Sequence, residues 1–205
     1  MYLVNCVVVS FLLVSCYVEA QNSRVATAFL DNKLIPNIEI VVPQLFISIN
    51  YSTVIVDLGT VVNPLQTLLQ PAVRFEANST ELYTFMFFGP DLPIDLIPRY
   101  TQFLHWLIVN IPGADMENGD TLATYFPPTP YPGGFPYLFL LYQQSEWIDP
   151  EPLYSLRSIL NRPGFDPVEF KNRHNLIGPI SGNFMREAYL SSQALENVLN
   201  SLKPS

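Results

Sequence analysis

Residues 103–113 read FLHWLIVNIPG, and this stretch decides the fold. It is almost wholly apolar, it is rich in β-branched residues, and Pro112-Gly113 ends it. This pattern predicts a central strand that is buried on both faces of a sheet. One titratable side chain, His105, lies near the start of the stretch. Because an unpaired buried polar group is costly, the functional question is what pairs with His105.

The composition favours a β-rich domain with a large core. Of the 205 residues, 49% are hydrophobic, 13% are aromatic, 14% are charged and 19 residues are proline. Many prolines and aromatic residues among few charges favour strands and turns over a helical bundle. The net charge is −8, and the 10 Lys and Arg residues form no basic cluster. We therefore expect neither nucleic acid nor an anionic membrane surface as a partner.

The first 20 residues have the features of a signal peptide. An apolar run leads to Val18-Glu19-Ala20, a small-residue site that suits cleavage by signal peptidase. The run is short for a membrane span of roughly 20 residues, so cleavage is favoured over the alternative, an uncleaved anchor. Both cysteines, Cys6 and Cys16, lie in this segment. We expect a secreted protein with a signal peptide over residues 1–20 and a cysteine-free mature domain over residues 21–205.

Two N-glycosylation sequons agree with export. They are Asn50-Tyr51-Ser52 and Asn78-Ser79-Thr80. Each lies in a polar break between apolar runs, where a glycan is tolerated. The sequence therefore predicts a glycoprotein modified at Asn50 and Asn78.

The remaining chain predicts one domain without internal repeats or a second core. Strands are predicted at residues 45–49, 53–59, 72–77, 81–88, 137–144 and 180–185. Residues 21–37 are predicted to form an arm, and residues 60–71 a loop or a single helical turn. The segment at residues 125–134 has four prolines in six residues, which excludes regular structure there.

Helices are expected toward the end of the chain. Residues 153–160 and 166–171 predict two short helices, the second with Asp166 as N-cap and Pro167 at the first helical position. Residues 186–202 carry apolar side chains on approximately one helical face, which predicts a C-terminal helix. His174 is interpreted as a solvated helix end, and the string Phe85, Phe87 and Phe88 as core.

Several segments carry motifs that occur together, in this order, in one known family. Residues 104–113 (LHWLIVNIPG) match the pattern H-W-L-V-x-N-I-P-G closely, and Pro90-Asp91-Leu92-Pro93 is similar to D-P-D-x-P. Residues 137–144 (YLFLLYQQ) and 181–184 (SGNF) continue the series. On these motifs the chain resembles the phosphatidylethanolamine-binding protein family over nearly all of the mature sequence. The resemblance implies a mainly β fold, in which a large antiparallel central sheet packs on a smaller sheet, with short peripheral helices and a C-terminal helix.

The resemblance also implies a pocket for phosphate-bearing head groups or acidic ligands. In the family, two acidic residues, the strand histidine, a loop glycine and a second histidine surround this pocket. Histidine and backbone N–H groups donate to phosphate oxygens there, while carboxylates orient the histidines. The chain keeps the second acidic residue as Asp91, the motif proline as Pro93, the strand histidine as His105 and the loop glycine as Gly133.

The chain departs from the family at the other positions. Gly89 occupies the first acidic position, and Phe135-Pro136 replaces the His-Arg pair before the last strand. We therefore expect a partly degraded pocket, with weaker phosphate affinity and a more apolar ligand than the full site would take. The predicted ligand-binding residues are Asp91, Pro93, His105, Gly133 and Phe135.

Each of these residues also has a purely structural interpretation. His105 could be a satisfied structural histidine bonded to Asp91, and Asp91 itself is typical of a turn. Gly133 could serve loop geometry alone. These alternatives stay open at the level of the sequence.

No catalytic or metal-binding pattern is present. The mature sequence has two histidines, no cysteine, no His/carboxylate cluster, no nucleophile elbow and no phosphate-binding loop. We expect a non-enzymatic, monomeric, secreted protein without a cofactor, which binds a small anionic or lipid-like ligand. The alternative is a non-enzymatic protein-interaction module with an inert pocket, either an inhibitor of a partner such as a protease or a signalling modulator. A hydrolase is the third and least favoured hypothesis.

Overall fold

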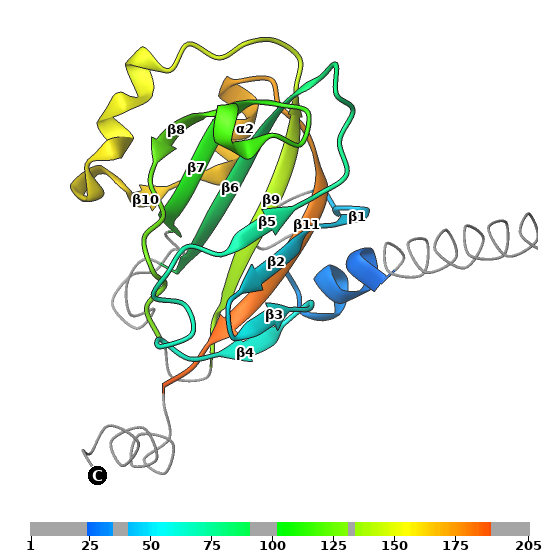
Figure 1. Ribbon diagram of the computed structural model, residues 1–205, viewed down its shortest axis with the longest axis vertical. Helices are drawn as coiled ribbons and strands as arrows, with labels where there is room; N and C mark the ends of the chain where they lie inside the picture. The colour runs from blue at the N-terminus through cyan, green and yellow to red at the C-terminus, as the bar shows by residue number, and fades with distance from the viewer. Residues whose placement is uncertain (1–23, 35–40, 91–101, 131–133, 190–205) are drawn as a thin grey trace, which may run out of the picture.

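The computed structural model describes residues 24–34, 41–90, 102–130 and 134–189, which fold around two β-sheets (Figure 1). The large sheet comprises β1 (Leu45–Phe46), β4 (Thr60–Val62), β6 (Leu82–Pro90), β7 (Gln102–Pro112), β8 (Asp120–Ala123), β9 (Pro136–Gln144), β10 (Pro163–Phe165) and β11 (Ile177–Glu187). The small sheet comprises β2 (Ser48–Tyr51), β3 (Val54–Val56) and β5 (Ala72–Arg74). The helical segments are residues 24–31, η2 (Met116–Asn118), η3 (Glu151–Arg157), η4 (Ile159–Asn161) and α2 (Pro167–Arg173).

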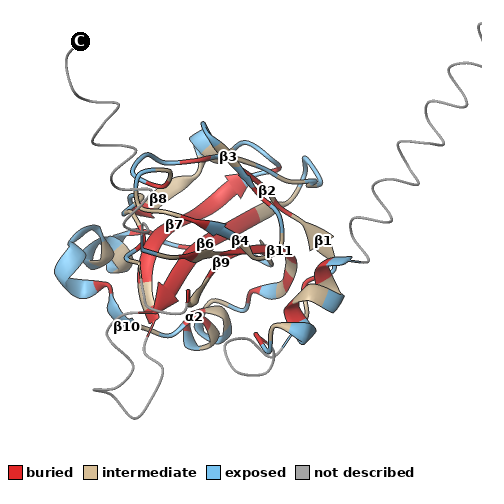
Figure 2. Ribbon diagram, turned by 90° about the horizontal axis from the view of Figure 1, so that it is seen from below, coloured by how far each residue is buried: buried red, intermediate tan, exposed pale blue. Residues whose placement is uncertain are grey.

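Three long apolar strands, β9, β6 and β7, form the middle of the large sheet and pair antiparallel. The sheet continues through β11, with which the short strands β1 and β4 pair in parallel. Most residues of β6, β7 and β9 are buried (Figure 2), as expected for strands covered on both faces. The predicted strands at residues 81–88, 103–113, 137–144 and 180–185 are confirmed, and so is the mainly β, two-sheet fold. The two parallel pairs make the large sheet mixed rather than purely antiparallel.

The core consists of two apolar clusters, one on each face of the large sheet. The inter-sheet cluster lies between the large and the small sheet and is rich in aromatic residues. The helix-side cluster lies on the opposite face, where residues from the N-terminal helix and α2 cover the strands. Phe85, Phe87 and Phe88 are all fully buried, which confirms their assignment to the core.

The described part of the predicted N-terminal arm begins with a helix. Residues 24–31 are helical, and Val25 and Phe29, four positions apart, are fully buried on one side of this helix. The Phe29 ring packs edge-on against Phe184 of β11 at 5.4 Å between centroids. The helix within the predicted arm at residues 21–37 was not predicted, because so short an amphipathic segment gives little periodic signal.

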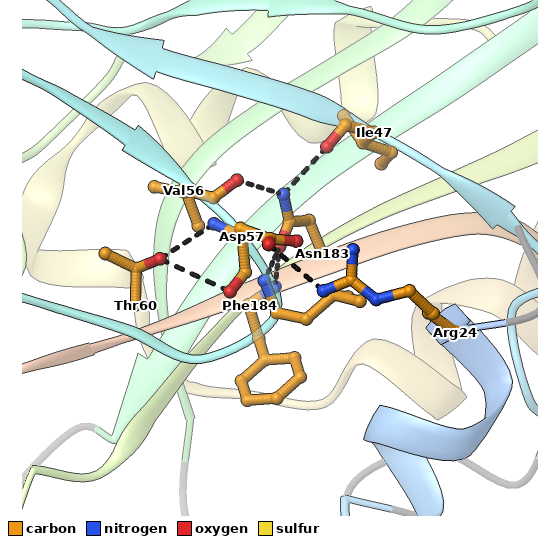
Figure 3. A network of polar contacts seen from close by, with 8 residues as sticks. Arg24, Ile47, Val56, Asp57, Thr60, Asn183 and Phe184 are labelled. Carbon is orange, nitrogen blue, oxygen red and sulfur yellow. Dashed lines mark hydrogen bonds and ion pairs between the residues drawn. The ribbon is translucent and has the colours of Figure 1, made fainter. Parts of the chain in front are cut away.

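A buried amide, Asn183 of β11, ties the two sheets together (Figure 3). Its Nδ2 donates to the Ile47 carbonyl at 2.8 Å and to the Val56 carbonyl at 3.0 Å. Its Oδ1 accepts from the N–H groups of Leu58 at 3.0 Å and Phe184 at 2.8 Å. One side chain thus pairs four buried or half-buried backbone groups, which explains physically why an asparagine stands in the SGNF motif.

Several short elements differ from their predictions. The hairpin of β2 and β3 pairs Tyr51 with Val54, so its turn lies at residues 52–53, and Asn50 lies inside β2. Residues 60–71 begin with a strand, β4, before the predicted turns. The helix predicted at residues 153–160 is a pair of 3-10 helices. The predicted cap of α2 is confirmed, because the Asp166 carboxylate accepts from the N–H groups of Val168 and Glu169, both at 2.9 Å.

The predicted C-terminal helix at residues 186–202 is wrong where the structure describes it. Residues 186–187 complete β11 and residues 188–189 have no regular structure. Residues 190–202 lie outside the described residues, as does the predicted signal peptide. Within the described ranges, no helix has the length and apolar character that a membrane span requires.

Candidate functional site

A β-bulge in β7 aims His105 into the inter-sheet cluster. Phe87 of β6 pairs with Trp106 and Phe88 pairs with Leu104, so His105 is the extra residue between these two pairs. The His105 ring contacts Phe87, and the Trp106 ring contacts Phe85, both of which belong to the inter-sheet cluster. Neighbouring residues of a regular strand point to opposite faces, whereas the bulge turns these two to the same face.

The tautomer of His105 follows from its hydrogen bond. The ring Nδ1 lies 2.9 Å from the Phe126 carbonyl oxygen, and the Phe126 N–H donates to the His105 carbonyl at 2.8 Å. A carbonyl oxygen only accepts, so Nδ1 carries the hydrogen and the other ring nitrogen, Nε2, is an acceptor. Nε2 is buried and has no hydrogen-bond partner among the described residues. Within the part of the chain that the structure describes, this acceptor therefore has no donor.

Aromatic rings surround the imidazole. The centroids of Phe103, Phe87 and Tyr137 lie 4.8, 5.1 and 5.4 Å from that of His105, and Phe126 lies at 6.4 Å. Only 2% of His105 is exposed to solvent. Burial is the main reason that the pKa of His105 falls to about 4, and the positive charge of Arg162 lowers it further. The imidazole is therefore neutral at pH 7.

Arg162 braces the segment beside His105. Only 3% of it is exposed, and its guanidinium donates to the carbonyls of Thr124 at 2.8 Å and Leu156 at 3.0 Å. Its own carbonyl accepts from the Leu104 N–H at 3.2 Å. Neutral carbonyl oxygens thus hold the arginine, which links Leu104, the residue before His105, to Thr124.

The structure describes only part of the predicted site. Asp91, Pro93 and Gly133 lie outside the described residues, so the predicted pairing of Asp91 with His105 stays a prediction. Phe135 is half-buried and packs against the inter-sheet cluster, which contains Phe87 and Tyr137.

The sequence did not predict the rings that surround His105. Phe103 lies two positions from His105 in the same strand, and this spacing was a usable signal. Phe126 comes from the proline-rich segment, where no local pattern indicates a contact with β7. Tyr137 begins a predicted strand, but only the sheet register places it beside Phe87 and His105.

A second buried polar group, Glu187, was also not predicted. It is fully buried at the end of β11, and its Oε2 accepts from the Thr67 hydroxyl at 3.0 Å. The other oxygen, Oε1, has no partner among the described residues. Burial raises the pKa of Glu187 to about 7.

Two tyrosines complete the polar cluster around Glu187. The Tyr125 hydroxyl donates to the Thr67 carbonyl at 2.6 Å and lies 3.2 Å from the Tyr51 hydroxyl. Burial raises the pKa of both tyrosines, and the nearby Glu187 carboxylate adds to the shift. The cluster fixes the segment after β4, through Thr67, to both sheets.

His174 differs from its predicted role as a solvated helix end. It follows α2 as its C-cap residue, is half-buried, and packs on Phe170 at 4.5 Å between ring centroids. Burial lowers its pKa, and Arg173 lowers it further. Among the described residues, no three His, Cys, Asp or Glu side chains are grouped as a metal site would require.

Both predicted glycosylation residues are exposed. Asn50 is exposed although it lies in β2, not in the polar break that the sequence predicted. Asn78 lies in a turn, where its Oδ1 accepts from the N–H and the hydroxyl of Thr80 at 3.1 and 3.0 Å.

Comparison with known proteins agrees with the fold. The family model for phosphatidylethanolamine-binding protein matches residues 63–196. A putative odorant-binding protein A5 of Drosophila melanogaster is 30% identical over 185 residues, which cover 87% of this chain and 88% of the relative. A 26 kDa secreted antigen of Toxocara canis is 33% identical over 163 residues, 77% of this chain and 62% of the relative.

A solved structure has the same fold at lower identity. It is a carboxypeptidase Y inhibitor complexed with its cognate proteinase, with a TM-score of 0.66 and 17% identity over 82% of this chain and 96% of that chain. The family match spans more than half of the sequence, and the two sheets agree with it. The chain therefore belongs to the phosphatidylethanolamine-binding protein family.

Proposed function

We propose that this chain is a secreted, non-enzymatic binding protein, which takes up a small, largely apolar ligand beside His105. The observation that carries the proposal is that Nε2 of His105, within a ring of aromatic side chains, has no hydrogen-bond partner among residues 24–34, 41–90, 102–130 and 134–189. A buried acceptor without a donor is unfavourable, and a ligand that supplies the donor removes this penalty. The ligand we infer has an apolar body and one hydroxyl or other neutral hydrogen-bond donor.

A phosphate head group fits this site less well. A phosphate oxygen needs donors, but His105 is neutral at pH 7 and its N–H is already bonded to Phe126. The chain also lacks the first acidic residue and the second histidine of the family pocket, since Gly89 and Phe135 stand in this part of the sequence. A neutral or apolar ligand is thus favoured over an anionic one.

Secretion is part of the same proposal. The apolar segment at residues 1–20 suits a signal peptide, and the exposed Asn50 and Asn78 suit glycosylation in the secretory pathway. One relative is named a secreted antigen, and another a putative odorant-binding protein. The first name agrees with secretion, and the second with binding of a small ligand.

Calorimetry with three probes tests the ligand class. We expect 1-octanol to bind more tightly than octanoate, and phosphoethanolamine to bind weakest. Replacing His105 by Phe keeps a ring in the cage but removes the acceptor, which should weaken 1-octanol binding at least fivefold. His174→Phe changes the other histidine and should leave the affinity unchanged. Low-micromolar binding of phosphoethanolamine that depends on His105 would overturn the proposal.

A second candidate is a protein-interaction module, as the fold neighbour in complex with a proteinase suggests by analogy. The supporting observation is a set of exposed apolar side chains between β9 and β10. Trp147 is 59% exposed and Leu160 is 83% exposed, with Tyr154 and Ile159 between them in sequence. Native mass spectrometry of the protein from its natural source separates the candidates. A co-purifying small molecule supports the first, and a protein partner lost on Trp147→Ala supports the second.

A further inference from the structure

A groove of about 630 Å³ lies at the edge of the inter-sheet space, apart from the His105 site. One wall is β5, the edge strand of the small sheet, and the other comprises β7, β8 and the turn that contains η2. Its volume falls within the range of small-ligand sites. Tyr125 stacks on Phe87 and meets Trp106 edge-on, both at 6.0 Å between centroids. Of these rings, Trp106 lines the groove and Phe87 contacts the His105 ring, and His105 itself is not among the lining residues.

The apolar part of the groove lining, here called the floor, lies beside the polar lining residues Gln70, Thr121 and Thr124. Trp106 and Ile108 of β7 contribute side chains that are otherwise 96% or more buried, and Val73 and Met116 are half-buried. Such a surface favours the hydrocarbon part of a ligand, because burial of apolar area is favourable at roughly 25 cal/mol per Å².

The rim of the groove is acidic. Asp115 and Glu117 are exposed and lie among its lining residues, and none of the described Lys, Arg or His residues lines it. Neither carboxylate forms an ion pair with a described lysine or arginine, and the Asp115 carboxylate accepts from the Asn118 amide at 2.7 Å. The whole chain carries a net charge of −8, which adds to the negative potential. An anion is therefore repelled, while a cation finds two carboxylates that pair with no lysine or arginine of the described segments.

We propose that this groove is a second ligand site, which binds an apolar amine. The ammonium group lies at the rim beside Asp115 and Glu117, and the hydrocarbon lies on Trp106, Ile108 and Met116. The pairing of charge with an apolar floor selects the amine over an alcohol of equal length, which lacks the charge, and over a carboxylate, which carries the wrong sign. This site goes beyond the proposed function, and neither depends on the other.

Tryptophan fluorescence gives a direct test, because the chain has only two tryptophans, Trp106 and Trp147. The substitution Trp147→Phe at an exposed position leaves Trp106, on the groove floor, as the sole reporter. The His105→Phe background removes the other proposed site. Octylamine, protonated at pH 7, should change Trp106 emission saturably, with at least threefold higher affinity than 1-octanol and higher still than octanoate.

Charge variants then locate the ammonium. Asp115→Asn with Glu117→Gln should lower octylamine affinity about threefold or more, and 0.5 M salt should weaken the wild-type interaction similarly. The matched pair Asp31→Asn with Glu151→Gln changes the net charge equally at exposed positions outside the groove and should have no effect. Octanoate binding as tight as octylamine, unchanged affinity in the rim variant, or no change in Trp106 emission would each refute the amine site. Retained circular dichroism confirms that each variant is folded.

Discussion

Gly89 lies directly beneath the ring of Tyr137, and a Cβ atom at position 89 would stand 2.2 Å from Tyr137 Cδ1. Real Cβ atoms do not approach other atoms so closely, and Gly89 is buried in β6. Tyr137 in turn donates from its hydroxyl to the Thr129 carbonyl, which fixes the ring. The missing carboxylate of the family pocket thus has a physical reason, because the space beside the Gly89 backbone is occupied by an aromatic ring.

Restoring that carboxylate should damage the fold rather than rebuild an anion site. Gly89→Asp must displace Tyr137 and bury a charge among aromatic rings, so we expect a loss of at least 2–3 kcal/mol in the free energy of unfolding, as is typical of overpacked cores. Gly89→Ala isolates the steric part and should lose about 1–3 kcal/mol. Urea unfolding measures both. Thr53→Asp, in the exposed hairpin turn, is the control and should change stability by less than about 0.5 kcal/mol. A stable Gly89→Asp variant that binds phosphate tightly would contradict this account.

The long apolar strands could be predicted from the sequence because nearly all of their residues are apolar. β6, β7 and β9 are covered on both faces, so continuous apolar runs mark them. The N-terminal helix and the short strands β4 and β8 could not be predicted with the same ease. Each of these elements has at most eight residues. Contacts with residues distant in sequence stabilise them, as Phe184 does for the helix through its contact with Phe29.

The candidate site was predictable only at its centre. His105 is conspicuous as the one titratable residue in an apolar strand, but its hydrogen-bond partner is a backbone carbonyl, which has no sequence signature. Glu187 gave no signal either, since its burial follows from the parallel pairing of β11 with β4. Contacts between side chains that the register of the sheet brings together thus cannot be predicted from local sequence patterns.

Asn183 should be among the most sensitive positions outside the apolar core. Asn183→Ala leaves the Ile47 and Val56 carbonyls and two N–H groups without their partner. Each buried group that stays unsatisfied lowers the free energy of unfolding by about 1–3 kcal/mol. Since water can reach some of these groups after relaxation, we expect a total loss of about 3–4 kcal/mol in urea unfolding. Asn172→Ala, at an exposed position of α2, is the matched control and should stay within about 0.5 kcal/mol of wild type. Equal stabilities of the two variants would show that Asn183 does not join the sheets.

Glycosylation at the two sequons should be detectable when the full chain is expressed in a eukaryotic secretory host. The secreted product should shift in mass on treatment with an N-glycosidase, because Asn50 and Asn78 are both exposed. Asn50→Gln and Asn78→Gln should each remove one glycan, and the double variant should no longer shift. Retention of the chain inside the cell, or a mass that the enzyme leaves unchanged, would argue against the secretory assignment.

His105 and Glu187 should give the stability of the protein opposite dependences on pH. The pKa of His105 falls from 6.5 to about 4 on folding, so the unfolded chain binds more protons and stability is lost as pH drops from 6.5 toward 4. The pKa of Glu187 rises from 4.5 to about 7, so the folded chain binds more protons and stability is lost as pH rises from 4.5 toward 7. Between pH 5 and 6.5 the two effects nearly cancel.

A single substitution at either residue should therefore reveal the pH dependence of stability that comes from the other residue, because in the wild-type protein the two dependences nearly cancel. Relative to wild type, Glu187→Gln removes the loss at higher pH, so its free energy of unfolding should rise by about 1–2 kcal/mol from pH 5 to pH 6.5. His105→Phe should fall by a similar amount over the same range, because only the Glu187 titration remains. Urea unfolding of the three proteins at both pH values measures the slopes, and taking each difference from wild type cancels the other titrating groups. If both variants parallel the wild-type curve, neither residue has the buried environment that the structure assigns to it.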